Sequence, residues 1–321
     1  MGDTAGHNNE TDVSAIVERR AEIAHGVVQL DLVAADGGTL PGWQPGAHID
    51  LVLGEHLVRQ YSLCGDPADS RRYRVAVLRE PAGRGGSEWV HAHLQAGDRL
   101  TVRGPRNHFE LRPAARYRFI AGGIGITPIL PMLRDAAQAG AEWSLVYGGR
   151  SLASMAFVDE LRASPEVQIV PQDAAGLIDV AAAIGDPADD TLVYCCGPEP
   201  LLKAVGDACA AWPGNPLRAE RFAAVDPGSA GPDVEFEVEL ARTGVTVTVP
   251  PEESILSVVM AGGVDVVFSC EDGVCGSCET VVLDGRPDHR DSVMTAEEHE
   301  AAGTMQICVS RSFGKRLVLD V

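Results

Sequence analysis

The sequence predicts a multidomain chain with three folds in series: an antiparallel β-barrel, an α/β domain on a parallel sheet, and a small α+β domain of the β-grasp type. Three observations support this prediction. The 321 residues exceed one ordinary core of roughly 100–200 residues. The rhythm of apolar runs changes near residue 117, and four of the eight cysteines lie in the last fifth of the chain. We expect the barrel at 12–114, the α/β domain at 115–224, a linker at 225–233 and the third domain at 234–321.

The first segment consists of short alternating apolar runs separated by Gly, Pro and Asp. Such runs, rich in β-branched residues, predict strands, and their close spacing favours an antiparallel barrel. We expect strands at 22–36, 46–53, 57–64, 72–80 and 97–104, with one short helix at 87–94.

The second segment alternates short apolar strands with longer helical stretches, as in βαβ units on a parallel sheet. We expect strands at 118–122, 143–149, 167–172 and 191–197, and helices at 127–140, 156–164, 177–185 and 198–212. This architecture commonly binds nucleotides, although a fold alone proves no ligand.

The stretch VDPGSAGPD lacks periodicity and is rich in Pro and Gly, which indicates a linker. After it, runs at 234–240 and 245–250 flank turn residues 242–244 and predict a hairpin. Ser254 is expected to cap a helix over 255–263. A final apolar run at 317–321 predicts the closing strand of a β-grasp domain.

The formal net charge of −20 argues against nucleic acid and anionic membrane surfaces as partners, because both would repel the chain; an acidity that serves solubility alone is the alternative interpretation. No apolar run approaches the roughly 18–20 residues of a membrane span, and the polar start is unlike a secretory signal. We therefore expect a cytoplasmic protein, whose eight cysteines do not form a disulfide framework.

The densest chemical signal is the run FSCEDGVCGSCETVVLDG, which spaces three cysteines as CxxxxCxxC, with a fourth after 29 intervening residues. This is the plant-type spacing for a 2Fe-2S cluster, in which a tight loop wraps three thiolates and a strand brings the fourth. The predicted ligands are Cys270, Cys275, Cys278 and Cys308. The alternative is a structural zinc site, which more commonly uses two CxxC pairs.

Two motifs in the barrel segment predict a flavin site. In the strand LVRQYSLC, Arg59 and Tyr61 project to one side, so a phosphate-pairing guanidinium and an aromatic ring lie together. The turn GRGGS at 83–87 opens a helix, and its backbone N–H groups and the helix dipole favour a phosphate. The alternative for Arg59 and Tyr61 is an exposed cross-strand pair.

The motif GGIGITP at 122–128 follows a strand and opens a helix, where a glycine turn lets a dinucleotide pyrophosphate approach. We expect Thr127 as the N-cap and Pro128 at the first helical position; a turn needed only for helix packing is the alternative. The sequence CGP at 196–198 ends the last strand of the sheet, at the edge where ligands bind. Arg150 and Ser151 follow the second strand, where an adenine ribose is expected.

These motifs, together with PRNHFEL at 105–111, AGGIGITPIL at 121–130 and the cysteine loop, resemble the phthalate dioxygenase reductase family, with the vanillate O-demethylase reductases as the nearest branch. The resemblance spans almost the whole chain after residue 12. It implies an FMN-binding barrel, a pyridine-nucleotide domain and a ferredoxin domain. Members of that family pass electrons from NADH to a Rieske-type oxygenase.

The resemblance also implies roles for individual residues. Ser62 would lie near the reactive flavin nitrogen and Cys196 near the nicotinamide, whereas the histidines at 91, 93 and 108 are not expected to act as acids or bases. FAD, commoner in the wider superfamily, is the alternative to FMN. The implied flavin ligands are Arg59, Tyr61, Ser62, Gly85, Gly86, Ser87 and Phe222, and the implied NAD ligands are Gly122, Gly123, Gly125, Thr127, Pro128, Arg150, Ser151, Cys196, Gly197 and Pro198.

The resulting expectation is a monomeric NADH-dependent oxidoreductase that serves a terminal oxygenase. NADPH is the alternative donor, because Arg150 could favour a 2′-phosphate. Two other functions stay open from the sequence: a reductase that serves a cytochrome P450, and a non-enzymatic ferredoxin-like redox module.

Overall fold

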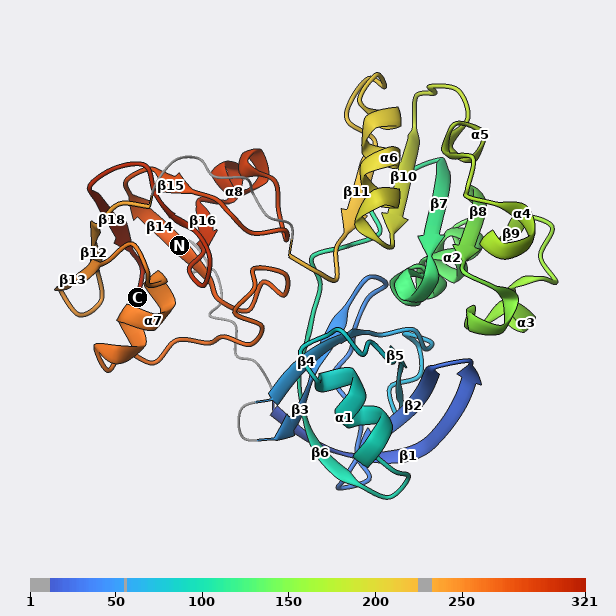
Figure 1. Ribbon diagram of the computed structural model, residues 1–321, viewed down its shortest axis with the longest axis horizontal. Coiled ribbons are helices and arrows are strands. Elements are labelled where there is room, and N and C mark those ends of the chain that lie inside the picture. Colours follow the sequence, from blue (N-terminus) through green and yellow to red (C-terminus); the bar gives the residue numbers. More distant parts are fainter. Residues whose placement is uncertain (1–11, 55–56, 225–232) are drawn as a thin grey trace. The chain divides into compact units, whose positions relative to one another are not determined.

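The computed structural model describes residues 12–54, 57–224 and 233–321, so the expected linker at 225–233 lies, apart from its last residue, outside the described residues. The chain divides into two compact units, one ending at Glu220 and one spanning Arg221–Val321. The first unit contains a six-stranded and a five-stranded sheet, and the second contains the small C-terminal sheets (Figure 1). The three-domain division stays a prediction.

The N-terminal sheet has six antiparallel strands in the order β4-β3-β6-β1-β2-β5. Helix α1 (Gly86–His93) lies against β3, β4 and β5, and buries Val90 in the core of this sheet. The two edges of the sheet approach each other where the backbone N–H of Cys64 donates to the carbonyl of Arg74 at 2.9 Å. The strands are β1 (Asp12–Ala24), β2 (Val27–Ala34), β3 (His48–Gly54), β4 (Leu57–Ser62), β5 (Tyr73–Leu78) and β6 (Arg99–Arg106).

The single strand expected at 22–36 is wrong. Residues on either side of Gly26, which has a φ of 74°, form the hairpin of β1 and β2. Strand β1 begins at Asp12, ten residues before the expected start. Its inward side chains include the small Ala15, and charged residues interrupt its alternation, so the apolar period was too weak to predict it.

The five-stranded sheet is parallel, in the order β11-β10-β7-β8-β9. Helices cover both faces: Phe119 on β7 packs with Ile129 of α2 (Ile126–Gln138), whereas the next residue, Ile120, packs with Leu202 of α6 (Glu199–Cys209). This confirms the α/β fold class. The strands are β7 (Arg116–Gly122), β8 (Glu142–Gly149), β9 (Val167–Pro171), β10 (Thr191–Cys196) and β11 (Leu217–Glu220).

Shorter elements differ from the expectation. The helices predicted at 156–164 and 177–185 contract to α3 (Val158–Leu161) and α5 (Val180–Ile184), while β11 and α4 (Gln172–Ala175) were not expected. Two 3₁₀ turns, η1 (Gly123–Gly125) and η2 (Leu152–Ser154), follow β7 and β8. Each of these elements spans five residues or fewer, too short for a clear apolar period.

The barrel and the parallel sheet share one hydrophobic core, which explains why they form one unit. Val27, Ala76 and Phe109 from the barrel side pack with residues of the parallel sheet. The rings of Phe109 and Tyr194 have centroids 5.4 Å apart. The Tyr194 hydroxyl also donates to the carbonyl of Glu110 at 2.8 Å. The two sheets are therefore fixed relative to each other by apolar contact and hydrogen bonding.

The second unit has a mixed sheet in the order β13-β12-β18-β14-β16, with a two-stranded sheet beside it. The expected hairpin at Arg242–Gly244 and the Ser254 cap, which accepts from the N–H of Ser257, are confirmed. The elements are β12 (Phe236–Leu240), β13 (Val245–Val249), α7 (Ile255–Ala261), β14 (Glu279–Asp284), β15 (Pro287–Asp288), α8 (Ala296–Ala302), β16 (Thr304–Gln306), β17 (Arg311–Ser312) and β18 (Arg316–Leu319). Within the described ranges, no helix has the length and apolarity needed to cross a membrane.

Candidate functional site

The predicted flavin-phosphate residues lie together at the start of α1. The Arg59 guanidinium donates to the carbonyls of Val58 and Arg84, which places its side chain over the GRGGS turn. A Cβ on Gly86 would lie 2.3 Å from Arg59 Cγ, so a larger residue here would displace the Arg59 side chain. Gly85 has a φ of 82° and caps α1. The structure thus brings the strand that carries Arg59 and the GRGGS turn to one place.

The Ser87 hydroxyl is engaged locally. It accepts from the N–H of Glu80 at 3.0 Å and lies 3.4 Å from the Glu80 carbonyl, closing the glycine turn. Ser87 therefore shapes the turn, and its predicted contact with a phosphate stays a prediction.

Tyr61 and Ser62 end strand β4 at the boundary between the barrel and the parallel sheet. Tyr61 is half-buried against the barrel core, and burial raises the pKa of its hydroxyl while Arg59 opposes that shift. Ser62 is buried, and its hydroxyl hydrogen-bonds the carboxylate of Glu220. This links β4 of the barrel to β11 of the sheet.

Glu220 was not foreseen as a site residue. It lies directly beside Cys196 in the parallel pairing of β10 and β11, and its Oε2 is 3.9 Å from Cys196 Sγ. Burial raises the pKa of Glu220 to about 8, although hydrogen bonds from Cys196 and Ser62 act in the opposite direction. Burial, followed by the nearby carboxylate, also raises the pKa of the Cys196 thiol. The three side chains can hold a proton between them near neutral pH.

The only sequence signal for Glu220 was its place two residues before Phe222. Phe222 itself is 46% exposed and belongs to the second unit, so its position over a flavin face stays a prediction.

The two turns expected at the nicotinamide site pack tightly against each other. A Cβ on Gly125 would lie 2.3 Å from the carbonyl oxygen of Cys196, and one on Gly197 would lie 2.9 Å from Gly122 Cα. A Cβ on Gly122 would lie 2.6 Å from Pro198 Cδ. Close packing is therefore enough to explain these glycines. This agrees with the alternative interpretation, in which the glycine turn serves only helix packing. Both turns nevertheless lie at the carboxyl edge of the sheet, where ligands bind in this architecture.

The predicted cap at Thr127 is wrong. Helix α2 begins at Ile126 with Gly125 as its N-cap, so Thr127 and Pro128 occupy the second and third helical positions. The Thr127 hydroxyl donates to the carbonyl of Ile124 at 2.9 Å. The 3₁₀ turn η1 already sets helical geometry before the threonine, which explains the shift of the helix start.

Arg150 and Ser151 follow β8 at the same edge, since Gly148 pairs in register with Gly122. The Arg150 side chain is exposed, and its carbonyl accepts from the N–H of Asp173. Ser151 forms a capping box with Ser154 that begins η2. Their predicted contact with an adenine ribose is compatible with this position and stays a prediction.

The four predicted cluster cysteines converge in the second unit. All four are buried; Cys270 contacts Cys275 and Cys308, and Cys308 contacts Cys278. Contact with Cys270, followed by burial, raises the pKa of the Cys275 thiol. Four mutually close thiolates require a cationic centre to neutralise them, so the donor set fits an iron-sulfur cluster.

The loop around these thiols is tightly constrained. Gly273 and Gly276 have φ values of 67° and 72°. A Cβ on Gly273 would lie 2.6 Å from Val309 Cγ2 and 3.0 Å from Asp291 Cα, so the loop packs directly on its neighbours. Close backbone approach is what a loop around inorganic sulfides needs.

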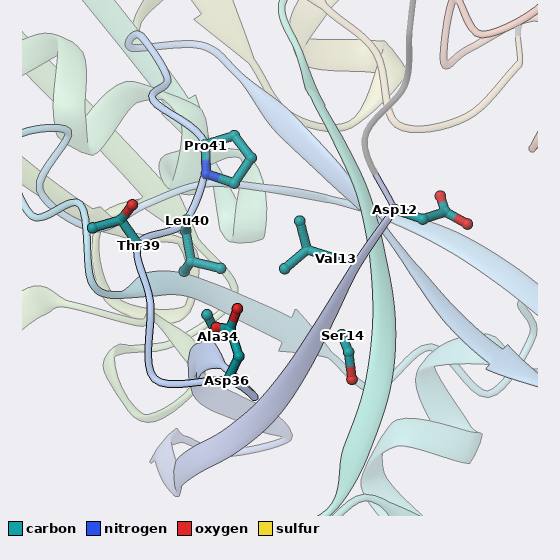
Figure 2. A pocket seen from close by; sticks show the side chains of 8 residues that line it. All are labelled: Asp12, Val13, Ser14, Ala34, Asp36, Thr39, Leu40 and Pro41. Carbon is teal, nitrogen blue, oxygen red and sulfur yellow. The ribbon is translucent and has the colours of Figure 1, made fainter.

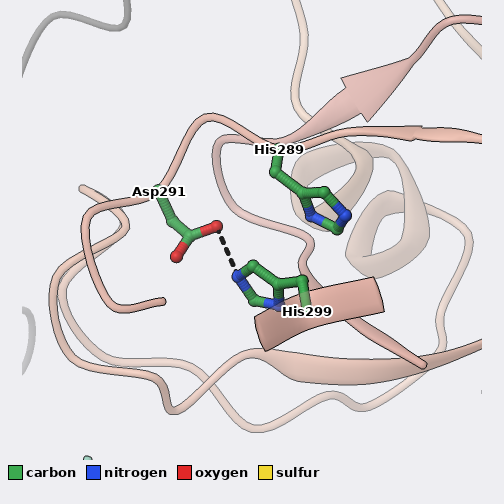
Figure 3. Close-up of side chains that lie close together, drawn as sticks. All are labelled: His289, Asp291 and His299. Carbon is green, nitrogen blue, oxygen red and sulfur yellow. Dashed lines mark hydrogen bonds and ion pairs between the residues drawn. The ribbon is translucent and has the colours of Figure 1, made fainter. Parts of the chain in front are cut away.

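Asp291 packs against Gly273 of this loop and pairs with His299; Figure 3 shows this pair together with His289. His299 is fully buried, and its Nε2 lies 2.8 Å from Asp291 Oδ2 while its Nδ1 faces the Thr304 hydroxyl. The His289 ring stacks on it, with centroids 4.4 Å apart and planes 3° from parallel. Although these three residues have metal-binding side chains, parallel stacked rings do not direct two lone pairs at one ion. We interpret the group as a structural support.

A surface cavity of about 460 Å³ lies on the barrel, lined by β1, the end of β2 and the following loop (Figure 2). None of the predicted flavin, nicotinamide or cluster residues lines it. Its lining residues are Asp12, Val13, Ser14, Ala34, Asp36, Thr39, Leu40 and Pro41.

Comparisons with known proteins agree with this arrangement. The model of the oxidoreductase NAD-binding domain matches residues 119–207, and that of the 2Fe-2S iron-sulfur cluster binding domain matches 238–312. The chain is 42% identical to the phenoxybenzoate dioxygenase subunit beta of Ectopseudomonas oleovorans, covering 96% of this chain and 97% of that one. It is 37% identical to the vanillate O-demethylase oxidoreductase of Pseudomonas sp. (strain HR199 / DSM 7063), covering 96% and 100%.

Among solved structures, phthalate dioxygenase reductase, described as transferring electrons from pyridine nucleotides to a 2Fe-2S centre, matches with a TM-score of 0.70. The two are 34% identical over 97% of this chain and 98% of that one. The chain also matches 41% of the length of a type IV self-sufficient cytochrome P450 monooxygenase, with a TM-score of 0.91 and 42% identity over 97% of this chain. The nucleotide-binding sheet, the cluster domain and the full-length identity agree: the chain is an oxidoreductase that belongs to the phthalate dioxygenase reductase family.

Proposed function

We propose that this chain is the reductase component of a multicomponent oxygenase or demethylase, and that it passes electrons from NADH through FMN and a 2Fe-2S cluster to a Rieske-type terminal oxygenase. The observation that carries the proposal is the Ser62, Cys196 and Glu220 group, which joins the predicted flavin strand to the predicted nicotinamide edge. The same chain also carries the four converging thiols.

Arg59 and the N–H groups of the turn at Gly85 and Gly86 would hold the flavin phosphate, because a guanidinium and a helix N-terminus both favour an anion. Tyr61 would lie against the ring system. Bound flavin supplies the conversion between two-electron and one-electron transfer, and the cluster supplies a one-electron outlet.

The chain's own contribution at the reacting edge is orientation and proton control. The carboxylate of Glu220, with its pKa raised to about 8, can keep a proton beside Cys196 and Ser62 at neutral pH. Because Cys196 is buried and its thiol pKa is raised, it stays neutral and would pack against the nicotinamide without reacting. The site requires no nucleophile.

FMN is proposed over FAD on the family likeness. Flavin released by denaturation and separated by chromatography distinguishes the two, and FAD as the main component would contradict the proposal.

NADH is proposed over NADPH as the electron donor. Because Arg150 is exposed where the adenine ribose is proposed to lie, a kcat/KM at least tenfold higher with NADPH would indicate that this arginine selects the phosphorylated cofactor.

A second acceptor, a cytochrome P450, is supported by the match to a self-sufficient P450 monooxygenase. Reconstitution with purified Rieske and P450 partners, with NADH consumption and substrate product measured together, distinguishes the two acceptors. Coupled turnover with P450 alone would contradict the proposed Rieske acceptor.

We also propose that the protein is a monomer located in the cytoplasm. Size-exclusion chromatography with light scattering would test the oligomeric state, and cell fractionation would test the location.

A further inference from the structure

Gln306 is a fully buried amide beside one of the cluster cysteines. It ends β16, where it pairs with Glu279, the residue that follows Cys278. Its Oε1 lies 3.4 Å from Cys278 Sγ, while its Nε2 is buried and has no hydrogen-bond partner among the residues that the structure describes. A buried amide donor without a partner loses its hydrogen bond to water and gains none in return, so this arrangement calls for a physical reason.

The reason lies in the charge of Cys278. As a cluster ligand the sulfur is a thiolate, which accepts hydrogen bonds and cannot donate one. The amide oxygen and nitrogen of glutamine exchange places when the group turns by 180°. That turn would remove the unpaired donor and point an N–H at the negative sulfur.

We propose that, in the cluster-loaded protein, Gln306 donates a hydrogen bond from Nε2 to the Cys278 thiolate and thereby raises the reduction potential of the cluster. One electron enters the cluster on reduction, without bond cleavage or proton transfer, and adds one negative charge to the iron-sulfur centre. Because a hydrogen bond to a ligand sulfur stabilises this more negative state, it favours reduction.

Neighbouring contacts make Gln306 the informative position. Cys270 Sγ accepts from the backbone N–H of Asp272 at 3.3 Å, a bond that no side-chain substitution removes. The Ser277 hydroxyl lies 3.0 Å from Cys275 Sγ, but Ser277 is part of the ligand loop itself. Gln306 lies outside that loop and is held by the β-ladder, so its amide can be removed without altering the CxxxxCxxC segment.

The test is an EPR-monitored redox titration of the full-length protein with and without Gln306→Met. Methionine keeps the length and burial of the side chain but removes the donor. Gln29→Met is the matched control, because Gln29 is a buried glutamine of the barrel whose amide donates to Asp31. We expect the equilibrium constant for cluster reduction to fall about tenfold in Gln306→Met, which is about 59 mV for one electron, and to be unchanged in Gln29→Met. A potential equal to wild type with full iron content would overturn the proposal.

A second measurement covers a variant that fails to hold its cluster. Wild-type protein labelled with ¹⁵N in its glutamine side chains should show a ¹⁵N coupling to the reduced cluster by pulsed EPR, and absence of that coupling would overturn the proposal. The inference rests on the proposed function. Wild-type protein without iron and sulfide would contradict that function, whereas a loaded cluster insensitive to Gln306 would contradict only this inference.

Discussion

The carboxylate of Glu220 lies 3.9 Å from the thiol of Cys196, side by side on two parallel strands, and Ser62 from the barrel hydrogen-bonds the same carboxylate. Three residues separated by up to 158 positions thus meet where the barrel joins the parallel sheet. Neither flanking sheet alone could assemble this group.

Glu220→Gln should change the pH dependence of stability. Burial raises the pKa of Glu220 to about 8, so the folded state binds more protons than the unfolded state between about pH 4.5 and pH 8. The wild-type free energy of unfolding should therefore fall as pH rises through this window, by at most about 1.4 kcal/mol per pH unit from this group. Chemical denaturation of both proteins from pH 5 to pH 9 measures the difference. Parallel curves for wild type and Glu220→Gln would show that the carboxyl titrates normally.

Gly125→Ala should weaken NADH binding and stability together, because its Cβ would lie 2.3 Å from the carbonyl oxygen of Cys196. We expect a loss of about 1–3 kcal/mol in stability and a higher KM for NADH. Gly206→Ala is the control: it lies in α6, its Cβ would meet only Leu217 at 3.8 Å, and alanine should be neutral or stabilising there. If both variants bind NADH like wild type, the tight contact of the two turns is not needed for the site.

Arg59→Ala should weaken flavin binding by about 1.5–3 kcal/mol, the range for a hydrogen bond to a charged group. Arg59→Lys should retain part of the affinity, because it keeps the charge but loses the planar fork. Fluorescence titration of apoprotein with FMN measures the dissociation constants. Arg103→Ala on strand β6, which removes an ion pair with Asp12, should leave them unchanged. Equal losses in the Arg59 and Arg103 variants would deny a specific phosphate role for Arg59.

Asp291→Asn should accelerate cluster loss. Asp291 accepts from the N–H groups of Val293 and Met294 and pairs with buried His299 behind the cluster loop. We expect iron release to a chelator to be several-fold faster than in wild type, followed by the decay of visible absorbance. Asp284→Asn, at an exposed position of the same unit, is the control. Identical release rates in the two variants would rule out a supporting role for this aspartate.

The sequence predicted the features that depend on local spacing. The separations between cysteines predicted the cluster ligands. Alternating apolar runs predicted the barrel, the repeated order of strand and helix predicted the α/β sheet, and a hairpin followed by a capped helix predicted the α+β domain. Predictions failed where local signals compete. The glycines at 123 and 125 already form a helical turn, so Thr127 is not the cap. Gly26 divides an apparently continuous strand.

Tertiary relationships were out of reach from the sequence. Glu220 stands in a four-residue strand without periodicity, and only pairing with β10 places it beside Cys196. Gln306 is a single polar residue in an apolar run, and nothing in the sequence marks it as a neighbour of the cluster. Only the pairing of β14 with β16 places it next to Cys278. Such residues acquire their roles from strand register, which one sequence does not specify.

The central claim is that electrons leave this chain through the cluster, downstream of a flavin reduced by NADH. Stopped-flow absorbance with the Cys275→Ser variant tests it most directly, with cytochrome c or the oxygenase partner as acceptor. The account predicts flavin bleaching by NADH at a rate close to wild type, together with loss of electron transfer to the acceptor. Full transfer to the acceptor without the cluster, or loss of flavin reduction in a folded, flavin-loaded variant, would contradict it.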